Sequence, residues 1–200
     1  MHQSSLANMR SFRERFLEAR RDDALVIFDI GSCDVNGSYR PLFEEPRWSY
    51  RGVDLEAGKN VDLVIRDPYH WREIAAASAD VVISGQAFEH IEYFWLTMLE
   101  VHRVLKSGGL CCIIAPSSGP EHRFPVDCWR FYGDGFRSLA RFAGLDVVEI
   151  GTTSDFSPFT DGSKMWKDTV FIGRKPVCSL AATWRARVKQ MLLRRLMMAW

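Results

Sequence analysis

The sequence predicts an α/β domain with a mostly parallel, seven-stranded sheet, an antiparallel final strand and helices on both faces. Two observations predict this class. Short segments such as 24-ALVIFDI-30 are apolar on both faces, as buried parallel strands are, and they alternate with segments of helical periodicity. The last two strand-like segments are joined by loop residues without a convincing helix, so we expect them to be antiparallel neighbours.

The individual elements follow from apolar spacing and from the glycines and prolines that interrupt it. The predicted strands lie at residues 24–30, 49–55, 61–65, 79–85, 110–116, 145–151 and 166–174. Helices are predicted over residues 5–20, 88–105 and 129–143, with a helical turn or two at 69–77 and only a short segment at 38–46, where two prolines stand.

Composition favours one well-buried domain in a reducing compartment. The chain has 200 residues, 47% of them hydrophobic, which is enough for one core and too little for two. An odd number of cysteines without CxxC spacing argues against a disulfide framework or a zinc site. No window approaches the ~18 apolar residues of a membrane span, and the N-terminus lacks the apolar run of a signal peptide. We therefore expect a cytoplasmic protein.

The chain divides into three predicted parts: a helical lid at residues 1–23, the α/β domain at 24–175 and a basic amphipathic helix at 176–200. Five basic residues follow Thr183 without an acidic one, so the rest of the chain carries a net charge of −4 against +1 for the whole. This helix could pack on the domain or on the mate in a homodimer, lie on an anionic membrane surface, or touch an acidic substrate. Because the basic residues gather in one tail, we expect no nucleic-acid partner.

Residues suited to ligand contact follow the predicted parallel strands. In such sheets ligands bind beyond the carboxyl ends of the strands, near the point where the strand order reverses. The strand ends carry Asp29-Ile30-Gly31, Asp54-Leu55, Asp67, Ser84-Gly85-Gln86 and Pro116. The sequence therefore predicts one ligand site along this edge of the sheet.

The ordered set DIGS…GVDL…ADVVISGQAFEHI…VHRVLKSGGL…IIAP resembles the class I S-adenosylmethionine-dependent methyltransferases, which have a Rossmann-like fold. The resemblance covers roughly residues 24–151 and the final strand. Within the family the chain is most similar to a bacterial subgroup with a DVNGS loop and an HxxPxDxWRF segment, here 122-HRFPVDCWRF-131. The resemblance implies S-adenosylmethionine as cofactor and an unidentified methyl acceptor.

The resemblance also implies roles for the strand-end residues. Asp54, 23 residues after Gly31, would accept from the ribose diol, with Leu55 beside it. Gly31 and Ser32 would bring backbone close to the methionine head, and Asp29 would attract its ammonium. Asp67 would accept from the adenine amino group. The methionine portion would lie against Ser84, Gly85 and Gln86.

Several of these residues also have structural explanations. The loop after the first strand has Cys33 and Val35 where the family often has glycine, although a cofactor without phosphate needs fewer glycines. Asp34 could cap a following helix instead of touching a ligand, and Asp67 could be a turn residue. The Glu89-His90 pair could simply begin a helix, where a carboxylate favours the dipole.

The acceptor side is predicted to lie over residues 117–131. His122 is the candidate general base, because its pKa suits proton transfer near neutrality, and Asp127 could orient it. Arg130 and His90 are candidate substrate contacts. The alternative is an internally bonded lid in which Arg130 pairs with an acid. We could not assemble three metal ligands from the sequence, so no metal is predicted.

Three functions remain open at this level. The first is a methyltransferase whose acceptor is a glycan, a small molecule or another group. The second is an NAD-dependent oxidoreductase, which could also use Asp54, although the chain lacks GxGxxG. The third is a non-catalytic cofactor-binding or membrane-associated interaction protein, since a fold does not prove a function.

Overall fold

The computed structural model describes residues 2–177, 188, 191–193 and 195–196. A single seven-stranded sheet has the strand order β3-β2-β1-β4-β5-β7-β6, in which β1 to β5 pair in parallel. The last strand along the chain, β7, runs antiparallel between β5 and β6. This arrangement confirms the predicted fold class, including the antiparallel final strand.

The elements lie close to the predicted positions. The strands are β1 (Leu25–Ile30), β2 (Trp48–Asp54), β3 (Leu63–Val64), β4 (Ala79–Gly85), β5 (Leu105–Pro116), β6 (Asp146–Thr152) and β7 (Asp168–Arg174). The α-helices are α1 (Gln3–Phe16), α2 (Phe94–Val104), α3 (Gly133–Ala143) and α4 (Ser163–Trp166), with 3-10 turns η1 (Glu18–Arg20), η2 (Arg40–Leu42) and η3 (Phe88–His90).

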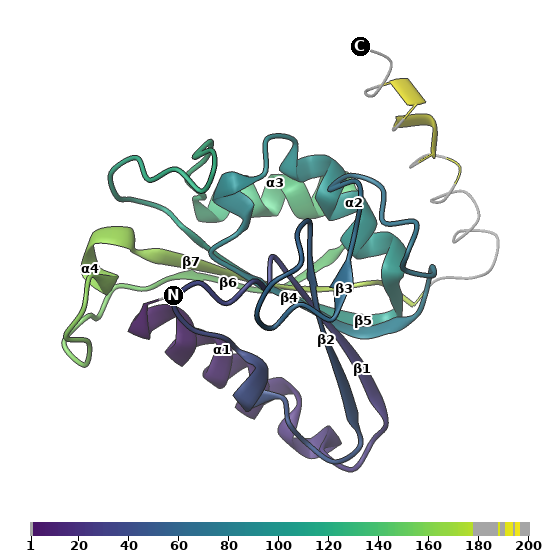
Figure 1. Cartoon of the computed structure of the whole chain (residues 1–200), viewed down its shortest axis with the longest axis horizontal. Helices are drawn as coiled ribbons and strands as arrows, with labels where there is room; N and C mark the ends of the chain where they lie inside the picture. The colour runs from purple at the N-terminus through teal and green to yellow at the C-terminus, as the bar shows by residue number, and fades with distance from the viewer. Residues whose placement is uncertain (1, 178–187, 189–190, 194, 197–200) are drawn as a thin grey trace.

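Two apolar layers hold the helices to opposite faces of the sheet (Figure 1). Successive residues of β1 show why the sheet is covered on both faces. Phe28 belongs to the layer under α2 and α3, whereas Ile27 belongs to the layer under α1. Side chains along a strand point alternately to its two faces, so a run that is apolar at every position must be covered twice.

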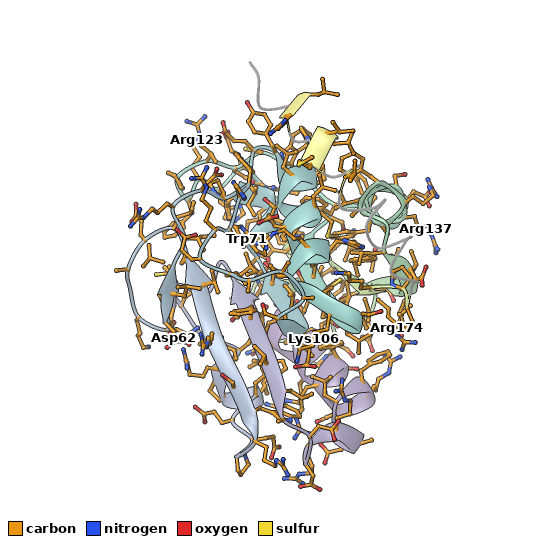
Figure 2. All side chains as sticks on the ribbon, turned by 90° about the vertical axis from the view of Figure 1, so that its right-hand side faces the viewer. Asp62, Trp71, Lys106, Arg123, Arg137 and Arg174 are labelled. Carbon is orange, nitrogen blue, oxygen red and sulfur yellow. The ribbon has the colours of Figure 1, made fainter. Side chains whose placement is uncertain are left out.

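The layer under α2 and α3 is rich in aromatic side chains. Phe136 of α3 is fully buried and stacks between Phe131 and Phe171, with ring centroids 5.1 and 5.4 Å away. Trp71 is also fully buried, and Figure 2 shows it inside the molecule, while Arg123 and Arg137 lie on the outside.

The predicted helix 88–105 is shorter than expected. Only η3 and α2 form, and a carbonyl of η3 is bonded outside the predicted helix. The carbonyl of Glu89 accepts from the amides of Cys128 and Trp129, at 2.8 and 3.2 Å, instead of from the amide four residues on as in an α-helix. The C-terminal end of the helix lies within one residue of the predicted one, because α2 ends at Val104. The stop is not a glycine, however, since β5 begins at Leu105 and contains KSGG. A register shift against β4 accommodates these residues.

Other boundaries also differ from the expectations. Residues 69–77 form turns rather than a helix, and α3 begins four residues later than predicted, at Gly133. The four-residue α4 was not predicted. The predicted C-terminal helix lies largely outside the described residues, although 188, 191–193 and 195–196 are helical. Within the described part of the chain no helix is long and apolar enough to cross a bilayer.

Truncation of Phe136 tests the aromatic layer. We expect Phe136→Ala to lower the free energy of unfolding by about 3–5 kcal/mol, because it removes a fully buried ring and leaves a cavity. Phe142→Ala, on the same helix but half-buried, should cost clearly less. Urea denaturation of both variants measures the difference, and equal losses would contradict the packing described.

Candidate functional site

The strand order reverses between β1 and β4, and the carboxyl ends of both strands lie side by side there. Gly31 follows β1 with φ +73, a conformation that side chains disfavour, and is exposed. A Cβ added to Gly31 would come within 2.4 Å of the Ala87 Cβ. Glycine at this position therefore lets the β1 loop pass close to the segment that follows β4, and its contact with a ligand stays a prediction.

The loop after β1 is fixed by the end of β2. Asp54 accepts from the amide of Cys33 through Oδ2, at 2.9 Å, and from its neighbour Leu55 through Oδ1, at 2.7 Å. The Asp54 carboxylate is half-buried, and Leu55 is exposed. The structure thus brings Asp54 and the Gly31 loop together. A carboxylate oxygen can accept two hydrogen bonds, and each Asp54 oxygen accepts one from the protein, so both can still accept from a ligand.

Ser32 and Asp34 have structural partners in the same loop. Ser32 is buried, and its carbonyl accepts from the Asn60 side-chain amide at 2.9 Å. Asp34 accepts from the Gly37 amide and forms an ion pair with Lys59, which lowers the pKa of its carboxyl. No helix follows Asp34 directly, so the predicted cap is instead a local turn.

Asp29 lies beneath this loop, buried at 2% exposure. Its Oδ2 accepts from the Tyr50 hydroxyl. Burial raises the pKa of Asp29 to about 7, the nearby Asp54 carboxylate adds to the rise, and the Tyr50 hydrogen bond and Arg40 oppose it. The predicted contact with an ammonium group would require this carboxyl to ionise and to exchange or share its Tyr50 partner.

The residues that end β4 are engaged with the rest of the protein. The Ser84 hydroxyl donates to the Ile30 carbonyl at 2.8 Å, so it ties β4 to β1. Gly85 leaves space for the Tyr39 ring, since an added Cβ would lie 2.0 Å from the Tyr39 hydroxyl oxygen. Gln86 donates to Ser5 Oγ and Asp168 Oδ1. Its side chain therefore connects the site edge to α1 and β7.

Asp67 lies beyond β3 and accepts from the Tyr69 amide at 2.8 Å. This bond agrees with the turn alternative. It uses one carboxylate oxygen, so the adenine contact stays a prediction.

The loop after β5 contains the candidate acceptor residues. Asp127 forms a two-pronged ion pair with Arg130, at 2.6 and 2.8 Å, and accepts from the His122 amide at 2.7 Å. The hydrogen bonds from Arg130 hold the pKa of Asp127 well below its usual range. The pairing of Arg130 with an acid is the internally bonded arrangement considered above, and it leaves Asp127 a positioning group rather than a proton acceptor.

His122 projects from this loop onto two aromatic rings. Its ring lies 4.8 Å from His90 and 4.4 Å from Trp166 of α4, between centroids. Its Nδ1 is 3.3 Å from Asp127 Oδ2, too poorly aligned for a hydrogen bond. Burial, followed by the neighbouring His90, lowers the pKa of His122, so the imidazole is neutral and able to accept a proton at pH 7.

Glu89 is the functional candidate that the sequence did not single out on its own. Its side chain is fully buried, neither carboxylate oxygen has a hydrogen-bond partner, and burial raises its pKa to about 8. Its position at a helix start in the sequence gave no sign of this burial, because the segment around Cys128 that covers it is distant in the chain.

Comparisons with known proteins agree with a Rossmann-like methyltransferase fold. Residues 28–113, from β1 into β5, match the family described as "Methyltransferase domain". No curated protein sequence matches the chain. The resemblance found in the sequence is thus supported at the level of the domain and the fold, while the DVNGS subgroup stays a prediction.

Solved structures with this fold include methyltransferases and one other enzyme. Burkholderia thailandensis 1,6-didemethyltoxoflavin-N1-methyltransferase, with bound S-adenosylhomocysteine, is 16% identical over 87% of this chain and 79% of its own, at a TM-score of 0.65. An Archaeoglobus fulgidus S-adenosylmethionine-dependent methyltransferase is 14% identical over 86% and 95%, at 0.62. The [4+2]-cyclase SpnF is 13% identical over 88% and 83%, at 0.65. At these identities the likeness shows the fold alone.

The Gly31 turn can be tested against a matched glycine. We expect Gly31→Ala to lower the free energy of unfolding by about 1–3 kcal/mol, because it combines a disfavoured φ with a clash against Ala87. Gly135→Ala should stabilise by up to about 1 kcal/mol, since Gly135 lies in α3 with open space around its Cα. Urea denaturation compares them, and a neutral Gly31→Ala would refute the close approach.

The raised pKa of Asp29 predicts a pH-dependent stability. The folded protein holds this proton with a pKa of about 7, against an ordinary value of 3.8. The stabilising contribution is therefore complete below about pH 4 and is lost as the pH rises through 7. Relative to Asp29→Asn, the wild type should lose on the order of a few kcal/mol between about pH 4 and about pH 8. The charged or titratable groups near Asp29 are Tyr50, Asp54, Arg40 and Tyr39. If the free energies of unfolding of the two proteins change with pH in the same way, Asp29 is not neutral in the folded protein.

Proposed function

We propose that this protein is an S-adenosylmethionine-dependent methyltransferase acting on an acceptor of unidentified class, a glycan or small molecule being the candidates. The observation that carries the proposal is the joining of the Gly31 loop to Asp54, inside the segment that matches a methyltransferase domain. An exposed backbone turn beside a half-buried carboxylate suits a ligand with an amino acid head and a ribose diol.

The residues at the sheet edge would each contact a different part of the cofactor. Asp54 would accept from the ribose diol with Leu55 beside it, and Gly31 and Ser32 would offer backbone to the methionine head. The remaining contacts would come from Asp29, Asp67, Ser84, Gly85 and Gln86. Bound there, the cofactor would supply a methyl group on a sulfonium sulfur that is already an activated leaving group.

The protein's own task would then be to hold the acceptor in line with that methyl group, which can account for many orders of magnitude in rate. His90 and Arg130 are the proposed acceptor contacts. His122 would take the proton of a protonated acceptor, with Asp127 holding the loop that presents it. The roles of α1 as a lid and of the C-terminal helix in a dimer or at a membrane surface stay predictions, as does a cytoplasmic location.

A second candidate function is binding of the cofactor without transfer of its methyl group. The fold is shared with a cyclase, so the fold alone does not separate the two functions. Binding and turnover must therefore be measured separately.

Calorimetric titration with S-adenosylmethionine, S-adenosylhomocysteine and NAD tests the proposal. We expect the first two to bind and NAD not to bind. Asp54→Ala should weaken the binding about 10- to 100-fold, the loss expected for hydrogen bonds to a charged group. Glu56→Ala, which removes an exposed carboxylate from the same loop, should leave it unchanged. Binding of NAD instead, or equal effects of the two substitutions with both variants folded, would overturn the assignment.

A further inference from the structure

Three potential metal ligands converge beside the predicted acceptor site. Glu89 and His90 come from η3, and His122 comes from the loop after β5. One ligand atom from each lies within 4.8 Å of the other two. The sequence separates His122 from the pair by more than thirty residues, and the loop returns because the amides of Cys128 and Trp129 bind the Glu89 carbonyl.

The Glu89 carboxyl group is available to a metal ion: its pKa of about 8 means that it keeps a proton at neutral pH until a cation displaces it. The group is fully buried, and both of its oxygens lack a hydrogen-bond partner. A buried polar group without a partner costs free energy, and more when it carries charge. The charge of Arg130 acts on Glu89 and opposes the rise of its pKa, but no hydrogen bond joins the two side chains. The terminal nitrogens of Arg130 are bonded to Asp127 and to backbone carbonyls, and its Nε has no partner.

The His90 ring is oriented as a metal ligand would be. Its Nδ1 lies 2.5 Å from the Val126 carbonyl oxygen, which can only accept, so Nδ1 carries the proton. The lone pair of Nε2 then faces Glu89 Oε1 across 3.7 Å. This separation is too long for a hydrogen bond, and a metal ion between the two atoms could be bound by both. A backbone carbonyl on the far nitrogen is the usual partner of a metal-bound histidine.

His122 is supported in a similar way. Its Nδ1 is 3.3 Å from Asp127, whose carboxylate is itself held by Arg130. A small rotation of the ring would let Nδ1 donate to Asp127 and leave Nε2 for an ion, which is the carboxylate–histidine arrangement common around protein-bound zinc. The His122 side chain is 38% exposed, so it has room for the small rotation that closes the three ligands onto one centre.

We propose that Glu89, His90 and His122 bind one divalent transition-metal ion, with zinc the best fit to two imidazoles and one carboxylate. Three protein ligands of this kind leave a fourth position open, as in catalytic rather than structural zinc sites. Imidazole nitrogens favour zinc and its first-row neighbours over magnesium or calcium. The ion would occupy the space between η3 and the loop after β5.

The ion would also change the chemistry on the acceptor side, a consequence that rests on the methyltransferase proposal. Its open position would take a water molecule or an oxygen of the acceptor and lower the pKa of that oxygen. The base role of His122 would then apply only to the metal-free protein, since its free lone pair would be on the ion.

Zinc binding can be measured on the full chain without any cofactor. After treatment with a chelator, titration with zinc chloride should show one site per chain with micromolar or tighter affinity, and magnesium chloride should not compete. Glu89→Gln and His122→Ala should each weaken zinc binding at least about tenfold, and Asp127→Asn about tenfold through the ligand it positions. Bound zinc should raise the Tm of the wild type and not that of the ligand variants.

Matched variants guard against adventitious binding. His70→Ala and Cys128→Ser remove metal-binding side chains outside the three-ligand set and should leave zinc affinity unchanged. The proposal falls if the wild type binds no zinc, or if the ligand variants bind it as tightly as the wild type. Cofactor titration in parallel separates the two proposals, since S-adenosylmethionine binding without zinc binding would overturn only this one.

Discussion

The buried carboxylate of Asp168 connects the parts of the structure on which the site depends. It has no exposed surface at the start of β7, and it accepts from Ser4 Oγ at 2.6 Å and Gln86 Nε2 at 3.0 Å and pairs with His2 at 2.9 Å. A buried charge must be compensated by its neighbours, so the start of α1 and the end of β4 are fixed relative to β7. The helix on one face of the sheet is therefore tied to the edge at which a ligand would bind.

That edge is built mainly from backbone, and side chains hold the backbone in place. Ser84 ties β4 to β1, Asp54 ties β2 to the loop after β1, and Tyr39 packs where Gly85 has no side chain. Sites on rigid elements keep their geometry better than sites on loops alone. On the acceptor side the corresponding role belongs to Asp127 and Arg130, which shape the loop that carries His122.

The sequence predicted the sheet well but not the grouping of Glu89 with His90 and His122, and the difference has physical causes. Doubly apolar runs leave a strand few alternatives, so all seven strands and the antiparallel β7 were found. The helix at 88–105 is shorter than predicted, and the Glu89 carbonyl bonds to a distant loop, which local periodicity cannot show. For the same reason the sequence pattern placed Glu89 at the start of a helix. The Gly31 loop and Asp54 were expected at one edge because both lie at the carboxyl ends of parallel neighbouring strands, whereas the cluster with His122 depends on how a long loop returns.

The distribution of unsatisfied groups argues that this cluster is more than a packing detail. Within the described residues, the buried side-chain atoms without a partner are both Glu89 oxygens, Trp95 Nε1, His122 Nδ1 and Arg130 Nε. Native proteins keep such atoms few because each costs free energy. All but the Trp95 atom belong to residues on η3 and the loop after β5, which meet at the Glu89 carbonyl. In most of a stable domain each residue suits its surroundings, and the exceptions usually lie at functional sites. The concentration of unpaired atoms in one place therefore indicates a function for this cluster. A metal ion bound there would replace the proton that burial keeps on Glu89 and would give the carboxylate a partner.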